Sequence, residues 1–87
     1  MKPKDLYQKA IEKWGEKAQM QMAVEECAEL IQALMKYGRE INGVDKYKVM
    51  QEIADVEIMM EQLREIFGNG DIDNFKRLKL ERLERLL

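Results

Sequence analysis

The sequence predicts an all-α protein, on three observations. Strong helix formers (Glu, Lys, Leu, Met, Gln, Ala and Arg) dominate the composition. The five glycines and the single proline leave long uninterrupted segments between them. No alternation of apolar and polar residues typical of a strand lasts more than a few positions. Because 87 residues suffice for one small domain, we expect a single domain over residues 1–87.

We predict four helices, over residues 3–14, 16–38, 44–67 and 71–86. Pro3 stands where a proline suits the first turn of a helix. Glycines at the three interruptions are typical helix terminators. Asn42 or Asp45 is expected to cap the third helix, and Asn69 or Asp71 the fourth.

The composition excludes several function classes. The net charge is −2 and the pI about 5.2, which argues against a surface for nucleic acid. No apolar run approaches the ~20 residues of a membrane span, and the first residues lack the hydrophobic stretch of a signal peptide. Cys27 is the only cysteine, which suits a reducing, cytoplasmic location. Histidine is absent, which excludes every imidazole-based mechanism.

Two pairs of acidic residues lie on helix faces that otherwise carry apolar side chains. In a projection at about 100° per residue, Glu26 falls inside the apolar arc of the second helix, and Glu29 lies at its edge. Glu52 is central to the apolar stripe of the third helix, and Asp55 lies at the corresponding edge. Because burying an unpaired carboxylate is costly, this repetition indicates a bound cation.

The four carboxylates are expected to converge if the second and third helices run antiparallel. Oxygen ligands without histidine favour the hard ion Mg²⁺, with Mn²⁺ as the alternative. Since Mg²⁺ keeps open positions that suit phosphate oxygens, a phosphorylated substrate is expected. The competing interpretation is that the acids form salt bridges at the edge of the core, which explains one such acid more easily than two matched pairs.

Three further positions are candidates for a role in the site. Lys79 and Arg82 on the fourth helix could balance phosphate charge, and the alternative is that both are solvated or snorkelling side chains. Trp14 most simply covers the end of the bundle, and its functional alternative is stacking on a nucleobase. Glu25 directly precedes Glu26 and could orient a water molecule.

The apolar content is high for a chain of this length. Hydrophobic residues make up 46% of the sequence and include many long aliphatic side chains and seven methionines. A domain this short buries only about 60% of the surface that its unfolded chain exposes. We therefore expect a bundle-like fold that is completed by self-association.

Two segments resemble a known family. VEECAEL (residues 24–30) and QEIADVEIMMEQL (residues 51–63) resemble the MazG-type all-α nucleoside triphosphate pyrophosphohydrolases, in which Glu-x-x-Glu is followed by Glu-x-x-Asp. The acids in these positions are Glu26, Glu29, Glu52 and Asp55. The similarity runs across residues 5–87 and is greatest to the small free-standing MazG-like proteins of Firmicutes and their phages.

The resemblance implies a Mg²⁺-dependent enzyme that cleaves an NTP or dNTP between its α and β phosphates. The four acids would bind the metal, and one of them or Glu25 would accept a proton from water. Lys79 and Arg82 would contact phosphates, as in the family's basic helix, and Trp14 is our candidate contact to the base. The family also implies a homodimer or homotetramer with sites between associated chains.

Two alternatives stay open at this point. Phosphoribosyl-ATP pyrophosphohydrolase shares the acidic pattern, so the motif alone does not fix the substrate. A protein of another class, a non-catalytic helical interaction module, would pair its buried acids with basic residues such as Lys79 and Arg82.

Overall fold

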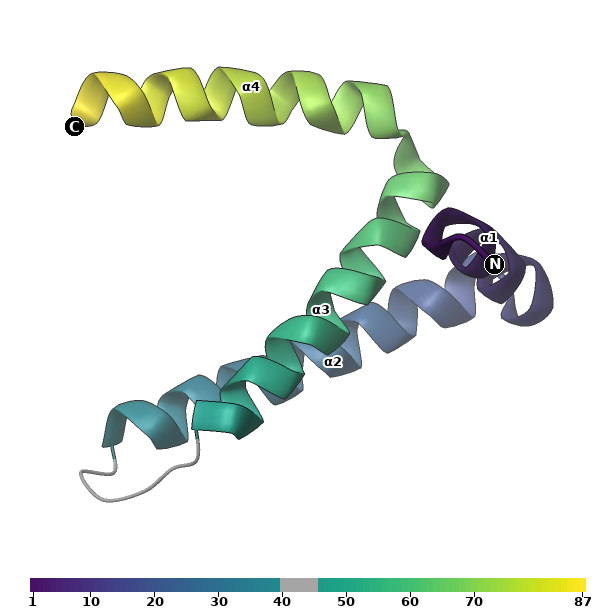
Figure 1. The fold of residues 1–87 in the computed structure, drawn as a ribbon, viewed down its shortest axis with the longest axis horizontal. Coiled ribbons are helices and arrows are strands. Elements are labelled where there is room, and N and C mark those ends of the chain that lie inside the picture. Colours follow the sequence, from purple (N-terminus) through teal and green to yellow (C-terminus); the bar gives the residue numbers. More distant parts are fainter. Residues whose placement is uncertain (40–45) are drawn as a thin grey trace.

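Residues 1–39 and 46–87, which the computed structural model describes, form four α-helices and no strand (Figure 1). The helices are α1 (Pro3–Trp14), α2 (Glu16–Arg39), α3 (Lys46–Phe67) and α4 (Asn69–Leu86). The predicted all-α class is confirmed over these ranges. None of the helices there is both long enough and apolar enough to cross a membrane.

Glycine sets two of the helix boundaries through a positive backbone φ. Gly15 (φ 92°) follows α1 and donates its backbone N–H to the carbonyl of Ile11 at 2.8 Å. Gly68 (φ 116°) separates α3 from α4. A side chain at these φ values would be strained, so both turns favour glycine. Pro3 opens α1, as predicted.

The remaining glycines with described structure do not end helices. Gly38 lies inside α2, which continues to Arg39, and Gly70 lies inside α4, which begins two residues earlier than predicted. Glycine within a terminal turn costs only about 1 kcal/mol relative to alanine, so it does not force a helix to stop.

The predicted cap of α4 is wrong. The N-cap residue is Gly68, and neither Asn69 nor Asp71 occupies that position. The Asn69 side chain instead accepts a hydrogen bond from Arg64 at 3.3 Å and donates one to Glu65 at 3.3 Å. The caps predicted for the third helix, Asn42 and Asp45, lie outside the described residues, as does the predicted helix start at residue 44.

Helices α2 and α3 lie side by side and antiparallel, and they contain every buried residue of the described ranges (Figure 1). Their buried and half-buried positions repeat in alternating steps of four and three residues, as in a coiled-coil seam. The repeat runs through positions 19, 23, 26, 30 and 33 of α2 and 52, 56, 59, 63 and 66 of α3. Further buried or half-buried positions lie beside it at 20, 27, 49, 62, 64 and 65. The seam therefore mixes small apolar residues with buried polar ones.

Helix α1 packs across one end of this pair and contacts both helices. Helix α4 turns away from the pair, and within the described ranges α3 is the only helix that it contacts. Polar contacts hold this corner, because Arg64 of α3 pairs with Asp73 of α4 at 2.8 Å. The radius of gyration is 15.7 Å, against about 12 Å for a compact chain of this length. The single chain is thus an open arrangement rather than a closed bundle.

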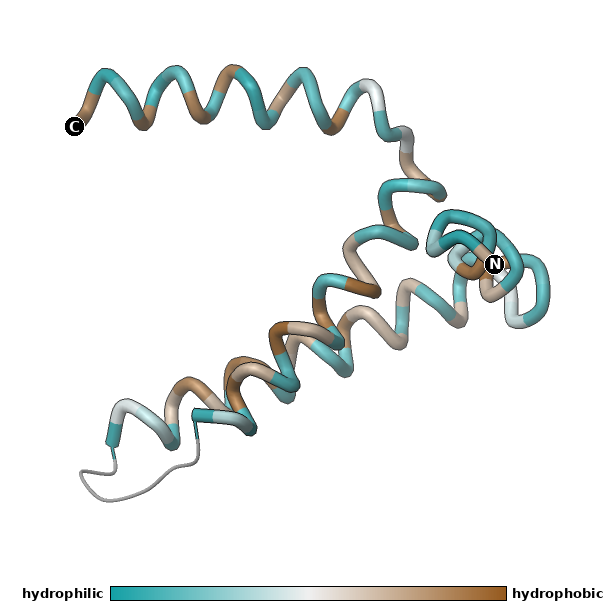
Figure 2. Tube along the Cα trace, in the orientation of Figure 1, coloured by the Kyte–Doolittle hydropathy of each residue, from teal (hydrophilic) through white to brown (hydrophobic). Residues whose placement is uncertain are grey.

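Apolar residues recur along the whole of α4, although the chain leaves them uncovered (Figure 2). No residue of α4, which is described throughout, is buried. Its large exposed apolar side chains are Phe75, Leu78, Leu80, Leu83 and Leu86.

Candidate metal centre

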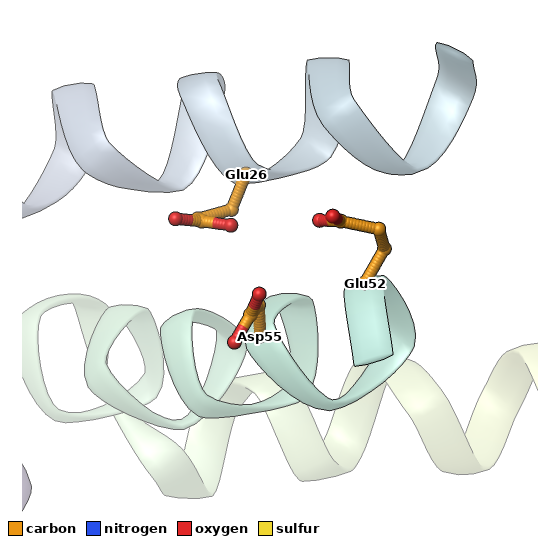
Figure 3. A group of neighbouring side chains, drawn as sticks. All are labelled: Glu26, Glu52 and Asp55. Atoms are coloured by element: carbon orange, nitrogen blue, oxygen red, sulfur yellow. The ribbon is translucent and has the colours of Figure 1, made fainter. Parts of the chain in front are cut away.

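Three carboxylates from α2 and α3 converge in the space between these two helices (Figure 3). Glu26 comes from the middle of α2, and Glu52 and Asp55 come from successive turns of α3. One oxygen of each carboxylate lies within 4.8 Å of those of the other two. The i,i+3 spacing puts Glu52 and Asp55 on one face of α3, and the antiparallel pairing brings Glu26 opposite them.

The two glutamates of this acidic cluster each bury an oxygen without a partner. Glu52 is only 3% exposed and Glu26 is half-buried, whereas Asp55 is exposed. Among the described residues, Glu26 Oε2 and Glu52 Oε2 have no hydrogen-bond partner. A buried acceptor without a partner costs about 1–3 kcal/mol, and more when it is charged. The arrangement is therefore unfavourable unless something else binds these oxygens.

The pKa of Glu26 reflects the same unfavourable burial of a carboxylate. Its pKa is raised above the ordinary value of 4.5, first because burial disfavours the charged form. The negative charges of Glu29, Asp55 and Glu52 raise this pKa further, as does a hydrogen bond with Glu29. A cation in the cluster would act in the opposite direction and favour the ionised form.

Lys48 forms an ion pair with a member of the cluster. Lys48 Nζ lies 2.8 Å from Glu52 Oε1, one helical turn away on α3. This contact raises the pKa of Lys48, and the charges of Glu29 and Asp55 raise it slightly more. One ammonium beside four carboxylates leaves an excess of negative charge around the cluster.

The fourth predicted acid, Glu29, lies beside the cluster rather than within its three-carboxylate group. It faces Glu26 closely enough to affect that pKa, and it is exposed. Glu29 also lines a pocket of about 290 Å³ with Gln32, Ala33 and Lys36 of α2 and with Lys48 and Glu52 of α3. A ligand in this pocket would reach Glu52 from the side of Glu29.

The donor set fits a hard divalent cation. All the donors are carboxylate oxygens, and two of them are buried and unpartnered. Oxygens bound to one Mg²⁺ at about 2.1 Å are at most about 4.2 Å apart, so a spread of up to 4.8 Å closes with small side-chain rotations. Mn²⁺ accepts the same ligands. Neither a soft ion nor an imidazole-bound ion is favoured by these residues.

The other predicted site residues are not brought to the acidic cluster within one chain. Lys79 and Arg82 lie on α4, which contacts no described part of α2. Trp14 is 58% exposed at the end of α1, with the Lys13 ammonium 5.3 Å from its ring centre. Glu25 is exposed on α2 beside Glu26.

A larger pocket lies elsewhere. It has a volume of about 1,030 Å³ and lies between α3, Tyr7 of α1 and the first turns of α4. None of the four predicted metal ligands lines it. We regard the acidic cluster as the candidate site because it combines unpartnered buried oxygens with converging charge, whereas the large pocket has mainly apolar walls.

The sequence interpretation missed two features of this region. Lys48 is four residues before Glu52, a spacing that predicts a contact on one helix face and would have identified the pair. Gln19 donates to Gln62 at 2.7 Å between α2 and α3, and both are buried. Gln19 is seven residues before Glu26, which places it on the same face, so projection of polar residues as well as acids would have found it.

No protein-family model, curated protein or solved structure was found to match the chain.

Proposed function

We propose that this chain is a Mg²⁺-dependent nucleoside triphosphate pyrophosphohydrolase of the MazG-like type, with Mn²⁺ as an alternative ion. The observation that supports it best is the convergence of Glu26, Glu52 and Asp55, with an unpartnered buried oxygen on each of the two glutamates. A stable helical pair gains nothing from that arrangement by itself, whereas a cation site requires it.

The residues that would hold the ion are Glu26, Glu52 and Asp55, with Glu29 beside them. When bound, Mg²⁺ would neutralise the phosphate charge and make a water molecule more acidic. Glu52 is fixed by burial in the α2–α3 seam, so its position costs little reorganisation during the reaction. Asp55 and Glu29 are exposed and would face the substrate side.

The proposed reaction consumes one water and one NTP or dNTP. A water oxygen forms a bond to the α phosphorus, and the bond from that phosphorus to the bridging oxygen of the β phosphate breaks. The products are the nucleoside monophosphate and pyrophosphate, and a carboxylate accepts the proton of the water. Glu25, Glu29 and the three acids of the cluster all lie within two turns of α2 or α3, so mutagenesis is needed to identify this base.

Self-association is part of the proposal. The accessible surface of 7,213 Å² exceeds by about 1,800 Å² the roughly 5,400 Å² of a compact monomer of this mass. That excess is larger than the ~800 Å² that each partner contributes to a standard interface. A homodimer or homotetramer would cover α4 and bring Lys79, Arg82 or Trp14 of one chain to the phosphates or base bound by another.

A second candidate, a helical interaction module, is favoured by the contact between Lys48 and Glu52. In that case the lysine would compensate the buried glutamate permanently, and no metal would be needed. The two proposals differ in one simple property. A metal centre predicts a melting temperature that rises with Mg²⁺ or Mn²⁺, and rises further with nucleotide, whereas a permanent ion pair predicts no rise.

The decisive experiment is pyrophosphate release from a panel of NTPs and dNTPs with Mg²⁺, with Mn²⁺ and with EDTA. Metal-dependent release that EDTA abolishes would support the proposal, and its rank order would identify the preferred base and sugar. Release from phosphoribosyl-ATP alone would change the substrate class. No release from any of these by folded, metal-loaded protein would favour the interaction module.

A further inference from the structure

The pocket beside the acidic cluster is lined by two lysines as well as by acidic side chains. Of its lining residues, Lys36 comes from the last turn of α2 and Lys48 from the first turn of α3. Glu29 and Glu52 line the same pocket next to the cluster. A single space of about 290 Å³ thus joins a cation-binding surface to two ammonium groups.

The start of α3 is itself an unfavourable place for these lysines. The first turn of α3 contains Lys46 and Lys48 and no acidic residue. The positive end of the helix dipole favours anions and disfavours cations. An anion in the pocket would therefore interact favourably with both the lysines and the helix end.

Lys48 contacts Oε1 of the same carboxylate whose Oε2 is unpartnered, so a metal bound to Glu52 would weaken this contact. Its ammonium lies 2.8 Å from the buried Glu52, although 60% of the lysine side chain is exposed. A divalent ion on Glu52 would repel the ammonium, and the long flexible side chain can turn away from Glu52 within the pocket that it already lines. The released charge would then be next to any phosphate that bridges the metal and the pocket.

We propose that Lys36 and Lys48 form the subsite for the terminal phosphates of the substrate, and that Lys48 exchanges its contact with Glu52 for a phosphate contact when metal and polyphosphate bind together. This inference rests on the proposed function. It identifies the ligand of the pocket as a polyphosphate that arrives with a divalent cation, because Glu29 and Glu52 would repel a free anion. The leaving pyrophosphate would occupy the subsite after cleavage.

The proposed exchange predicts that removal of Lys48 changes two binding affinities in opposite directions. Without phosphate, Lys48 competes with the metal for Glu52, so its removal strengthens metal binding. With phosphate, Lys48 is a ligand, so its removal weakens binding of the metal–phosphate complex. A lysine that only supports the fold would change both affinities in the same direction.

The experiment is calorimetric titration of the full chain with Mn²⁺ alone and with preformed Mn²⁺–pyrophosphate complex. For Lys48→Met we expect Mn²⁺ alone to bind about 3- to 10-fold more tightly, and the complex at least about 10-fold more weakly. Lys36→Met should weaken binding of the complex and leave binding of Mn²⁺ alone within about twofold of the parent chain. Lys46→Met is the matched control, because it removes the same charge from the same turn but does not line the pocket.

Other outcomes would overturn the inference. If Lys46→Met and Lys48→Met change the two affinities equally, the effect would come from the loss of positive charge near the site and not from a specific contact of Lys48. Weaker binding of Mn²⁺ alone in Lys48→Met, with helicity unchanged by circular dichroism, would make the lysine a support of the site. If the parent chain binds Mn²⁺ and the substitution changes neither affinity, the subsite fails and the metal centre remains. If the parent chain binds no Mn²⁺, both proposals fail together.

Discussion

The α2–α3 pair and α4 place their apolar residues in opposite ways. The pair contains every buried residue of the described ranges, whereas α4 has none. Yet the pair also buries Gln19, Glu52 and Gln62 in its seam, and α4 exposes a row of leucines. Polar groups are thus enclosed and apolar groups left outside.

This difference indicates that one chain can form the acidic cluster by itself but cannot cover the apolar surface of α4. The acidic cluster needs only α2 and α3, which pack against each other along their length. The apolar surface of α4 needs a second surface, because α3 touches it only near their shared corner. We therefore expect substitutions in the seam to act on metal binding and chain stability, and substitutions on α4 to act on association.

The largest expected effect is the loss of catalysis on substitution in the cluster. Asp55→Asn removes one ligand charge from an exposed position, so the helices should remain intact. Because a catalytic metal contributes several kcal/mol to transition-state stabilisation, pyrophosphate release should fall by more than about 100-fold. The rise in melting temperature with Mg²⁺ should disappear in parallel.

Glu57→Gln is the matched control for Asp55→Asn. It is exposed on the same helix, two residues further along, and is not part of the cluster. Its metal-dependent activity should stay within about twofold of the parent chain, as for surface changes away from such features. Full activity in Asp55→Asn would remove this residue from the metal site.

A second prediction compares truncation in the two regions. Met59 is 5% exposed in the seam, so Met59→Ala should lower the free energy of unfolding by about 2–5 kcal/mol at any protein concentration. Leu83 is 49% exposed on α4, so Leu83→Ala should cost less than about 0.5 kcal/mol in the isolated chain. Urea denaturation at several protein concentrations measures both values.

Although Leu83→Ala should hardly change the stability of one chain, we expect it to weaken self-association. Light scattering is expected to show a larger increase in the dissociation constant for Leu83→Ala than for a truncation at an exposed polar position of α4, such as Glu81→Ala. If Leu83→Ala leaves association unchanged, the apolar row of α4 is not the interface.

The sequence predicts the elements of the molecule better than it predicts their arrangement. Helical projection placed Glu52 in the core face and Asp55 at its edge, and the structure agrees. Projection reports which way a side chain points but not which helix lies opposite. The direction of α4 depends on the φ of Gly68 and on the pair between Arg64 and Asp73, neither of which has a periodic signal.

Stability should depend on pH through Glu26. Because its folded-state pKa lies above the ordinary value of 4.5, the folded chain holds this proton more tightly than the unfolded chain. The stabilising contribution is full below pH 4.5 and is lost as the pH rises through the raised pKa. Metal-free protein should therefore melt at a lower temperature as the pH increases across that window.

Two comparisons isolate the contribution of Glu26 to the slope of melting temperature against pH. Glu26→Gln keeps the shape of the side chain without a titrating group, so the slope of the parent chain minus that of the variant belongs to Glu26. Saturating Mg²⁺ should reverse the difference, because the ion binds the ionised carboxylate. A parent and variant with the same pH dependence in EDTA would contradict the raised pKa.

The smallest expected effect is that of a double substitution at Gln19 and Gln62. The Gln19 amide donates a hydrogen bond to the side-chain oxygen of Gln62 at 2.7 Å in the seam. Gln19→Leu alone leaves the buried side-chain oxygen of Gln62 without the donor that Gln19 supplies, and should cost about 1–3 kcal/mol. The double substitution to leucine removes both polar groups, so its cost should be much smaller than the sum of the single ones.

The double variant also tests whether polar groups in the seam serve the metal site. If Gln19 and Gln62 only fix the register of α2 against α3, the apolar pair should preserve stability and leave Mn²⁺ affinity within about threefold of the parent chain. A larger loss of Mn²⁺ affinity in a stable double variant would mean that register sets the distance between Glu26 and Glu52. That result would make the buried amides positioning residues for the cluster, and the seam would then be built for the site rather than for stability.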